Sequence, residues 1–476
     1  MIPLTLAEVA AATGGRIEGD PTTLVRSVTT DSRVVEPDSL FVALTTATAD
    51  GHDHAGSAHR AGASAVLSER SVALPGPPSV VVPDTWAALR ALASFVRDRV
   101  SPTTVAVTGS VGKTTVKDFA AAAIGAGRRV HAARGSFNNE LGVPLTLLGL
   151  ESDDEVLVAE IGARHEGDIA DLAPLVSPDV AIVTAVAAVH LEVFGSLAAI
   201  GRAKAELVEA LGTGGVAVLH AADPIVAAMA ARAPSSLMVA LDADPRLSGA
   251  GATPDVWAED VRLDRRARPS ATAVTPWGRT RLQLPIAGRH QLLNGLFALT
   301  VAAHLGVALE AAAAALAHAP ISPWRGAVDE VGGVVVLDDA YNANPTAVAA
   351  ALQTLVALER TGAAIAVLGE MAEIGVTAVD EHRSIGRQCA ELGVDRLVVV
   401  GAAASAVAAG AREAGMIDVV EVPDAGAAAA LLRGGLVPGD AVLVKASRVA
   451  GLERVAAELR SSLADGPPAR LGEGST

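Results

Sequence analysis

Apolar residues in this chain fall mainly into short uninterrupted runs, and stretches with helical spacing separate these runs. Between residue 104 and about residue 320 the runs are TVAVTG, VLVAEIG, DVAIVTAV and GVAVLH. After the segment AHAPISPWRG they are VVVLDD, AAIAVLGE, RLVVVG, DVVEV and DAVLVKAS. Continuous runs of Val, Ile and Leu are typical of parallel strands that are buried on both faces. Because helical stretches alternate with the runs, the pattern predicts two successive doubly wound α/β units.

Two interruptions of this pattern divide the chain into three predicted domains. The first hundred residues carry shorter runs around one predicted helix near DHAGSAHRAGA and a second at TWAALRALASFVRDRV, and SPTT follows them. AHAPISPWRG makes the second break, because Pro beside small residues punctuates secondary structure. We expect a small α/β amino-terminal domain at 1–101, a central domain with a mostly parallel sheet at 102–321, a Rossmann-like carboxyl-terminal domain at 322–462 and a disordered tail at 463–476.

Composition and charge narrow the class of protein. The 476-residue chain has a formal net charge of −16, so no nucleic-acid partner is expected, because such proteins usually present a basic surface. The single cysteine, Cys389, excludes an intrachain disulfide framework and suits a reducing compartment. The first residues lack the pattern of a signal peptide, and no charge-free apolar stretch reaches ~20 residues. We expect a monomeric cytoplasmic protein that is not inserted in a membrane.

The segment VTGSVGKTT (107–115) follows a predicted strand and opens a predicted helix. Such a loop surrounds phosphate oxygens with its N–H groups, while Lys113 reaches the outer phosphates and the Thr114 hydroxyl holds Mg²⁺. The segment departs from the full P-loop pattern, since Val107 stands where the first glycine belongs. A glycine-rich turn without a ligand is the alternative. The residues predicted to bind the triphosphate are Gly109, Ser110, Val111, Gly112, Lys113, Thr114 and Thr115.

Two polar residues follow neighbouring predicted strands of the central domain. Glu160 closes VLVAEIG, and His190 follows AIVTAVAAV. Ligands of open α/β sheets collect at the carboxyl ends of strands, and a carboxylate suits Mg²⁺. The alternative is structural: Glu160 could cap a helix, and His190 could be a satisfied polar group.

Lys204 lies in RAKAEL and is one of only four lysines, against 33 arginines. Counting from Ser196, a plausible N-cap, places Lys204 in the same helical stripe as Leu197, Ile200 and Leu207. A buried ammonium is costly unless it is paired or neutral, and lysine, unlike arginine, can lose its proton. A neutral amine can react with CO₂ to form a carbamate, whereas a snorkelling lysine or an ion pair is the simpler alternative.

Taken together, the motifs resemble the ATP-dependent Mur ligases of peptidoglycan synthesis. DSRVVEPDSLFVAL and DGHDHA resemble the family's amino-terminal uridine-nucleotide domain. The central domain is matched in order by TGSVGKTTVKD, GSFNNELGVPLTLL, AEIGARHEGDI, AAVHLEVFGS and RAKAEL, and the later part by GRHQLLNGLFAL, DDAYNANPTA, LGEMAEIG and VKASR. The resemblance covers about residues 28–455. It favours the D-alanyl-D-alanine-adding branch, because the DNPR signature of the diaminopimelate- or lysine-adding branch is absent. Asp38 replaces a glycine of the family, and a second expected glycine is missing before DGH.

The resemblance implies a reaction and assigns its residues. ATP phosphorylates the terminal carboxylate of UDP-N-acetylmuramoyl-tripeptide, and the amine of D-alanyl-D-alanine then displaces phosphate. The implied metal ligands for Mg²⁺ are Thr114, Glu160 and His190, with carbamylated Lys204 beside them. The implied catalytic residues are Lys113, Lys204, His190 and Arg325. The other residues implied at ATP are His290, Asn294, Arg325, Asp339, Tyr341, Asn342 and Asn344, and those on the UDP-substrate side are Ser32, Arg33, Asn138 and Asn139.

Several alternatives stay open at this point. Tyr341, the chain's only tyrosine, could simply fill a domain interface, and Asp339 could end its strand or cap the helix after Pro345. Another Mur-type ligase, a folylpolyglutamate-synthase-like relative or a P-loop switch without ligase chemistry are the competing functions. A GTPase switch is disfavoured because none of the four lysines lies in an N-K-x-D motif.

Overall fold

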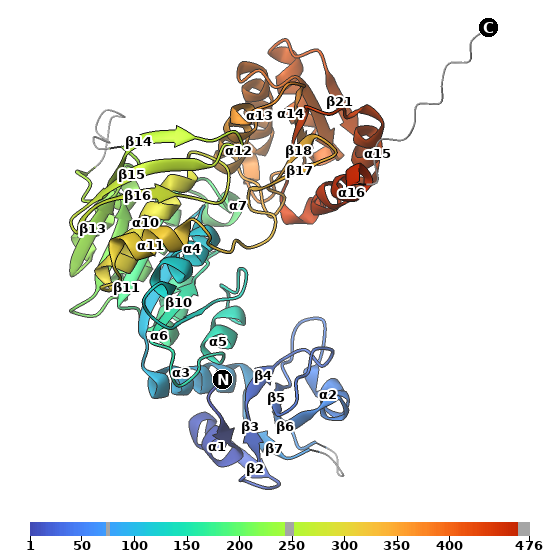
Figure 1. The fold of residues 1–476 in the computed structure, drawn as a ribbon. Coiled ribbons are helices and arrows are strands. Elements are labelled where there is room, and N and C mark those ends of the chain that lie inside the picture. Colours follow the sequence, from blue (N-terminus) through green and yellow to red (C-terminus); the bar gives the residue numbers. More distant parts are fainter. Residues whose placement is uncertain (73–76, 243–251, 465–476) are drawn as a thin grey trace.

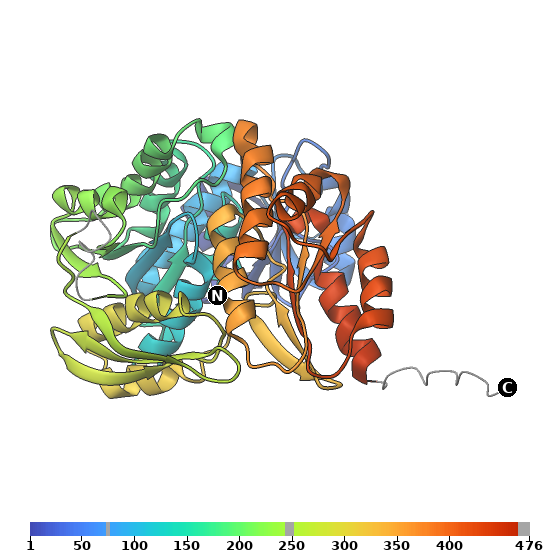
Figure 2. The ribbon, with the colours of Figure 1, turned by 90° about the horizontal axis from the view of Figure 1, so that it is seen from above.

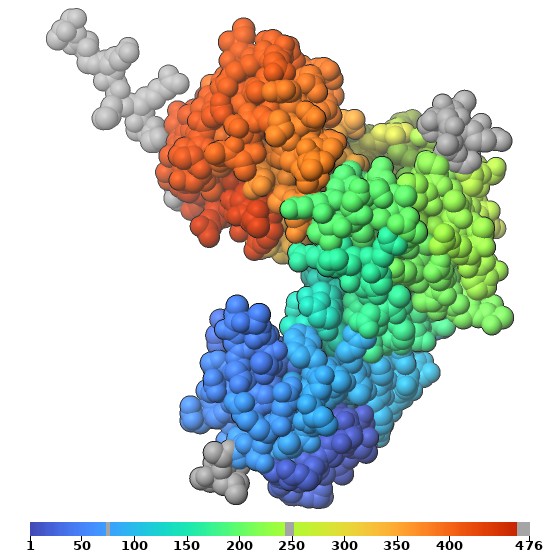
Figure 3. All heavy atoms as spheres, turned by 180° about the vertical axis from the view of Figure 1, so that it is seen from behind, coloured from blue at the N-terminus to red at the C-terminus, as the bar shows by residue number. Residues whose placement is uncertain are grey.

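The computed structural model describes residues 1–72, 77–242 and 252–464, and it has three α/β domains. The central domain lies between the other two (Figure 1). Seen from above, the carboxyl-terminal domain lies beside the central domain along one flank (Figure 2). A space-filling view shows a hollow between the amino-terminal and carboxyl-terminal domains (Figure 3).

The amino-terminal domain contains a mixed sheet in the order β2-β7-β6-β5-β4, in which only β2 runs antiparallel to its neighbour. Its elements are β1 (Leu4–Thr5), α1 (Leu6–Thr13), β2 (Arg16–Glu18), β3 (Leu24–Val25), β4 (Ser27–Thr29), β5 (Ser39–Val42), η1 (Gly51–His54), α2 (Ala55–Ala61), β6 (Ala63–Ser68), β7 (Ser79–Val81) and α3 (Thr85–Val100). The predicted helix TWAALRALASFVRDRV is confirmed as α3, and Asp84 caps it by accepting from two backbone N–H groups. Its buried residues Leu89 and Leu92 share one core with Leu147 and Leu172 of the central domain, so α3 joins the two domains.

The central domain is built on a parallel sheet in the order β13-β12-β11-β8-β10-β9. The elements of this sheet and its helices are β8 (Thr103–Thr108), α4 (Lys113–Gly125), β9 (Val130–Ala132), α5 (Gly142–Leu147), β10 (Val156–Glu160), α6 (Asp168–Val176), β11 (Val180–Val183), α7 (Leu191–Phe194), α8 (Leu197–Glu209), β12 (Val216–His220), α9 (Pro224–Ala227), η2 (Ala228–Arg232), β13 (Ser235–Val239), α10 (Gln291–His304) and α11 (Leu309–Leu316). Alternate side chains of β8 enter different cores, with Val105 and Val107 on one face and Ala106 on the other. Burial on both faces explains why these strands are uninterrupted apolar runs.

The central domain also contains a second sheet that the apolar runs of the sequence did not predict. The antiparallel strands β14 (Trp257–Leu263), β15 (Pro269–Thr275) and β16 (Gly278–Gln283) form this sheet and pack on α10 and α11. β15 alternates strictly between buried and half-buried residues, because only one of its faces meets the helices.

The carboxyl-terminal domain has a sheet in the order β17-β18-β22-β19-β20-β21, parallel except for the β17–β18 hairpin. Its elements are β17 (Ala327–Val331), β18 (Val334–Asp338), α12 (Pro345–Ala357), β19 (Ala364–Leu368), η4 (Gly375–Thr377), α13 (Ala378–Glu391), β20 (Arg396–Val400), η5 (Ala402–Ala404), α14 (Ser405–Glu413), β21 (Val419–Val422), α15 (Ala425–Gly435), β22 (Ala441–Lys445), η6 (Arg448–Ala450) and α16 (Glu453–Ala464). Separate cores lie on the two faces of the sheet, which is the predicted doubly wound arrangement.

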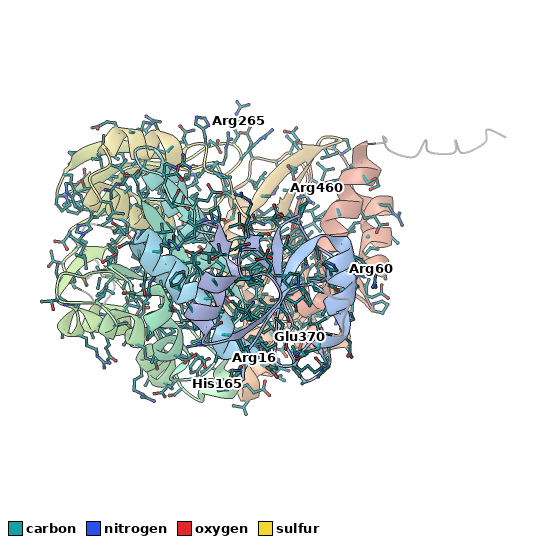
Figure 4. The ribbon with its side chains drawn as sticks, turned by 90° about the horizontal axis from the view of Figure 1, so that it is seen from below. Arg16, Arg60, His165, Arg265, Glu370 and Arg460 are labelled. Carbon is teal, nitrogen blue, oxygen red and sulfur yellow. The ribbon has the colours of Figure 1, made fainter. Side chains whose placement is uncertain are left out.

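The last helix is tied to the first strands of this domain. Arg460 on α16 donates to Asp338 (2.9 Å) and Asp329 (2.7 Å), and Figure 4 labels Arg460 on α16. The predicted tail begins too early in the sequence, because residues 463 and 464 still belong to α16; the remainder, from residue 465, lies outside the described residues. Among the helices that the structure describes, none is both long and apolar enough to cross a membrane.

Candidate active site

A cleft of about 1020 Å³ opens at the carboxyl ends of the central strands, against the carboxyl-terminal domain. The order of the central sheet reverses at β8, which has β10 on one side and β11 on the other. Such a switch point is where open α/β sheets bind ligands. The P-loop follows β8, and Glu160 and His220 end β10 and β12, so the carboxyl ends of several strands supply the lining.

The P-loop (residues 109–112) has the backbone that an anion site needs. Gly109 and Gly112 have φ values of +141° and +83°, and a Cβ at Gly109 would lie 2.0 Å from the Thr184 hydroxyl oxygen. No side chain caps the start of α4, so its first N–H groups are available to phosphate oxygens. Lys113 Nζ donates to the Gly109 carbonyl at 2.7 Å, and burial lowers its pKa while Glu160 opposes that change.

Oxygen ligands gather directly behind the P-loop. The Thr114 hydroxyl donates to Glu160 Oε2 at 2.7 Å and lies 2.9 Å from the Ser136 hydroxyl. Asn138 Nδ2 donates to the other carboxylate oxygen of Glu160 at 2.7 Å. Hydroxyl and carboxylate oxygens are the ligands that Mg²⁺ prefers, and the described residues contain no cluster of three His, Cys, Asp or Glu that could hold a metal ion alone. The site therefore fits Mg²⁺ that is bound partly through nucleotide phosphates.

His190 lies across the cleft in a strained backbone conformation, with φ of 52°. Its Nδ1 lies against the carboxylate of Glu373, which belongs to the carboxyl-terminal domain and also has a positive φ, 62°; burial lowers the pKa of His190, while Glu373 opposes that change. Arg164 lies 3.5 Å from the same carboxylate. A carboxylate on one ring nitrogen orients the other, as is usual for histidines that bind metals.

Lys204 occupies the buried position that helical spacing predicts. Ser196 caps α8 as expected, and Lys204 is only 2% exposed. Burial, with a smaller contribution from the positive charge of Lys113, lowers the pKa of Lys204 to about 7, and no hydrogen bond offsets this within the described part of the chain. Glu206 and Asp168 oppose this lowering of the pKa from a distance, but neither forms a salt bridge with Lys204 among the described residues, so the simple ion-pair alternative lacks a direct partner. Leu197, predicted for the same buried stripe, is instead exposed at the first turn of α8.

The flanking residues of RAKAEL have structural roles of their own. Glu206 accepts from the N–H groups of Gly167 (2.7 Å) and Ala170 (2.9 Å), so it caps α6. Arg202 binds Glu166 through two hydrogen bonds of 2.9 and 2.7 Å. Both contacts fix the loop that precedes α6 and leave Lys204 facing the cleft.

The carboxyl-terminal domain contributes an aromatic and charged wall. The Arg325 guanidinium lies 3.9 Å above the Tyr341 ring and donates to the Ser136 hydroxyl at 2.9 Å, so it bridges two domains. Lys445 donates to the Asp339 carboxylate at 2.5 Å and to the Asn342 carbonyl at 2.9 Å. Tyr341 thus stabilises the Arg325 guanidinium at the cleft through a cation–π contact. A side chain that only filled the domain interface would not need this contact.

Two of the residues implied at ATP also make structural contacts within the protein. Asn344, and not Asp339, caps the helix after Pro345, because its side chain accepts from Ala347 N at 2.9 Å. Asn294 donates to Gln291 at 2.7 Å and touches the P-loop, since a Cβ at Gly112 would lie 2.8 Å from its Oδ1. His290 begins α10 beside them as its N-cap residue.

The structure brings together at this cleft every predicted site residue except two. Ser32 and Arg33 lie in the loop between β4 and β5 and do not line it; Arg33 is exposed and binds Asp31 at 2.7 Å, which lowers the pKa of Asp31 to about 2. Asn138 and Asn139 do line the cleft. The sequence pattern missed Ser136, Glu373 and His220. The Nδ1 of His220 is buried and has no hydrogen-bond partner among the described residues.

The fold and this site define a P-loop nucleotide-binding enzyme whose phosphate site faces a separate Rossmann-like domain. Three family descriptions match the chain: "Mur ligase family, catalytic domain" at 24–97, "Mur ligase middle domain" at 107–302 and "Mur ligase, glutamate ligase domain" at 326–448. The chain belongs to the Mur ligase family.

Curated relatives and solved structures agree with this assignment. The UDP-N-acetylmuramoyl-tripeptide–D-alanyl-D-alanine ligase of Mycobacterium tuberculosis is 41% identical over 96% of this chain and 97% of its own length. The Escherichia coli enzyme of the same name is 36% identical, over 86% of this chain and 88% of its own. A MurF crystal structure from Acinetobacter baumannii superposes with a TM-score of 0.85 at 30% identity, covering 96% of this chain and 99% of that one. MurF from Thermotoga maritima in complex with ADP gives 0.78 at 28% identity, covering 93% and 98%.

Proposed function

We propose that this chain is an ATP-dependent ligase that joins D-alanyl-D-alanine to UDP-N-acetylmuramoyl-tripeptide in peptidoglycan precursor synthesis. The observation that carries the proposal is a single cleft in which the P-loop, an oxygen-rich cation site and the Arg325–Tyr341 pair of the last domain face one another. Relatives named for this reaction align with nearly the whole chain, which supports the choice of acceptor.

The reaction needs charge neutralisation and alignment more than covalent chemistry by the protein. The tripeptide carboxylate attacks the γ-phosphorus of ATP, giving an acyl phosphate and ADP. The amine of D-alanyl-D-alanine then attacks the acyl carbon, and phosphate leaves as the amide forms and the amine loses its proton. Lys113 and Arg325 both line the cleft, and their proposed role is to neutralise the transferring phosphoryl group. Closure of the outer domains over the hollow would exclude water from the acyl phosphate.

Mg²⁺ is proposed at Thr114 and Glu160, with a second ion near His190. When bound there, Mg²⁺ would neutralise phosphate charge in the reaction. The protein's own contribution is to hold the ligands: Glu160 is 1% exposed and is fixed by Thr114 on one oxygen and Asn138 on the other.

Lys204 is proposed to carry a carbamate. The addition of CO₂ to a neutral amine forms an N–C bond and releases one proton, so it needs a lysine that is deprotonated near neutral pH. A pKa of about 7 supplies that form, and the cleft gives CO₂ access to Nζ. ¹³C NMR with ¹³C-bicarbonate tests this directly: a carbamate carbonyl signal is expected in the wild type and absent in Lys204→Arg. Full activity of Lys204→Arg in added bicarbonate would reduce Lys204 to a simple cation.

The amino-terminal domain is proposed to bind the uridine part of the substrate through the Ser32–Arg33 loop. The exposed Arg33 would exchange its Asp31 partner for a phosphate, and Arg suits this role because its guanidinium binds phosphate in a bidentate manner. We also propose a cytoplasmic monomer, since both substrates are small molecules.

Phosphate release with UDP-N-acetylmuramoyl-tripeptide, with and without D-alanyl-D-alanine, tests the proposed reaction. Release is expected to need both substrates, ATP and Mg²⁺, and mass spectrometry should find the pentapeptide product. Release driven by L-lysine or diaminopimelate with the dipeptide precursor, and not by D-alanyl-D-alanine, would instead assign another Mur-type ligase. Steady ATP hydrolysis that ignores every acceptor amine would indicate a P-loop switch.

A further inference from the structure

Lys117 is a buried lysine that the proposed reaction does not use. It lies one turn beyond Lys113 on α4 and is 2% exposed. Its Nζ donates to the carbonyls of Ala133 (2.7 Å) and Gly135 (2.9 Å) and pairs with Asp118 at 2.7 Å. These three acceptors match the three donors of an ammonium group, so the buried charge is fully satisfied.

The two carbonyls belong to the start of a functional loop. Residues 133–141 connect β9 to α5 and carry Ser136 and Asn138. Ser136 meets the Thr114 hydroxyl and the Arg325 guanidinium, and Asn138 binds Glu160. Lys117 therefore fixes the base of the loop whose tip completes the oxygen-rich site.

Asp118 makes a second connection from the same turn of α4. One carboxylate oxygen binds Lys117, and the other accepts from Ser322 N at 2.9 Å. Ser322 lies in the segment between α11 and β17 that leads into the carboxyl-terminal domain, three residues before Arg325. The adjacent residues Lys117 and Asp118 thus hold the loop and the interdomain segment to one helix.

We propose that Lys117 and Asp118 are positioning residues that couple the P-loop helix to the substrate-side loop and to the interdomain connection. Binding of phosphate at the start of α4 would be transmitted to Ser136 and Arg325 through rigid contacts about one helical turn away. Lysine suits position 117 because three acceptors converge on one point, whereas the planar guanidinium of arginine is too large and spreads its donors. The predicted effect on turnover rests on the proposed function. The predicted effect on hydrogen exchange does not, because the contacts of Lys117 and Asp118 form without the substrate.

Hydrogen exchange on the full-length protein, with and without ADP and Mg²⁺, tests the coupling. In the wild type, ADP is expected to protect the P-loop and also segments 133–139 and 318–325. In Lys117→Met, the P-loop should remain protected while 133–139 loses its ADP-dependent protection. In Asp118→Asn, the interdomain segment should exchange faster. Arg128→Met, which removes a half-buried cation 3.8 Å from Glu155 just past the other end of α4, is the matched control and should behave as wild type.

Kinetics give the second measurement. With ADP affinity within ~3-fold of wild type, kcat of Lys117→Met should fall ~100-fold, as a displacement of catalytic groups by about 1 Å would cause. Lys117→Arg should have a similarly low kcat.

Equal protection of 133–139 in Lys117→Met and wild type would overturn the proposal, as would full kcat in Lys117→Arg. If Lys117→Met does not fold, the same exchange measurement on Asp118→Asn decides alone. Because exchange needs only ADP, failure of the wild type to form product would count against the proposed reaction and not against the coupling.

Discussion

Replacing Lys204 with methionine is expected to stabilise the protein while it removes activity. Methionine keeps the length and helix propensity of lysine without an amine that must be desolvated. Lys204 is 2% exposed, and burial brings its pKa to about 7, against 10.5 for an ordinary lysine. Burying the Lys204 amine therefore lowers the free energy of unfolding of the wild type, because the amine is more stable as an ammonium in water.

The size of this cost follows from the two pKa values. At 1.36 kcal/mol per pKa unit, the difference between 10.5 and about 7 corresponds to about 5 kcal/mol between the ammonium and the neutral amine. Above pH 10.5 the amine is neutral in both folded and unfolded states, so the cost vanishes. It grows as the pH falls toward 7, because only the unfolded state then binds the proton, and it is constant at lower pH. Lys204→Met should exceed the wild type in unfolding free energy by ~4 kcal/mol at pH 7 and by ~2 kcal/mol at pH 9.

Hydrogen exchange of the α8 amides in increasing urea, at pH 6, 7 and 9 without metal, nucleotide or bicarbonate, measures this difference on the element concerned. Arg202→Met is the control on the same helix: its exposed ion pair with Glu166 is worth little, so its small effect should not vary over this pH range. If Lys204→Met were no more stable than the wild type, or if the gap were the same at pH 7 and pH 9, the buried amine would not bear the inferred cost.

Three further changes have expected outcomes. Thr114→Ala removes the hydroxyl proposed to bind Mg²⁺ beside Glu160 and should weaken Mg²⁺-dependent ADP binding ~10-fold or more, measured by calorimetry with and without EDTA. Gly109→Ala places a Cβ 2.0 Å from the Thr184 oxygen at a φ of +141°, and should abolish ADP binding in the same assay. Arg460→Leu leaves the buried Asp338 carboxylate with no guanidinium and should cost about 3–5 kcal/mol in urea unfolding, most of which a second change, Asp338→Leu, should recover.

Strands that are buried on both faces could be predicted from the sequence alone. The runs that became β8, β10, β11 and β22 are continuously apolar in their middle positions because both faces of each strand pack in a hydrophobic core. The sheet of β14–β16 could not be found in this way, because its strands meet helices on one side only and carry polar residues on the other. Their alternation over six or seven residues is weaker than a continuous run.

The site residues likewise include some that could be predicted from the sequence and others that could not. Glu160, which ends β10, and His190, at the start of α7 after β11, could be predicted because parallel strands bring their carboxyl ends to one edge. Ser136 and Glu373 could not, since each acts through a partner far away in the sequence: Arg325 for the serine and His190 for the glutamate. Asn344 both caps α12 and lines the cleft, whereas from the sequence Asp339 could have been the residue that caps this helix.

The four lysines can be interpreted from the sequence and the structure together. Arginine is the usual cation of this chain, so we infer that each lysine occupies a position where arginine would not serve. Lys117 and Lys445 are each 2% exposed and each meet three converging acceptors, which only a compact ammonium can satisfy. Lys113 must turn from the Gly109 carbonyl toward a phosphate. Lys204 is buried as deeply as Lys117, yet no hydrogen bond stabilises its charge among the residues that the structure describes. The charged form of lysine thus explains positions 117 and 445, where acceptors surround the ammonium. At position 204 the neutral amine is the form that fits. Lys204→Met should therefore increase the free energy of unfolding in a pH-dependent manner.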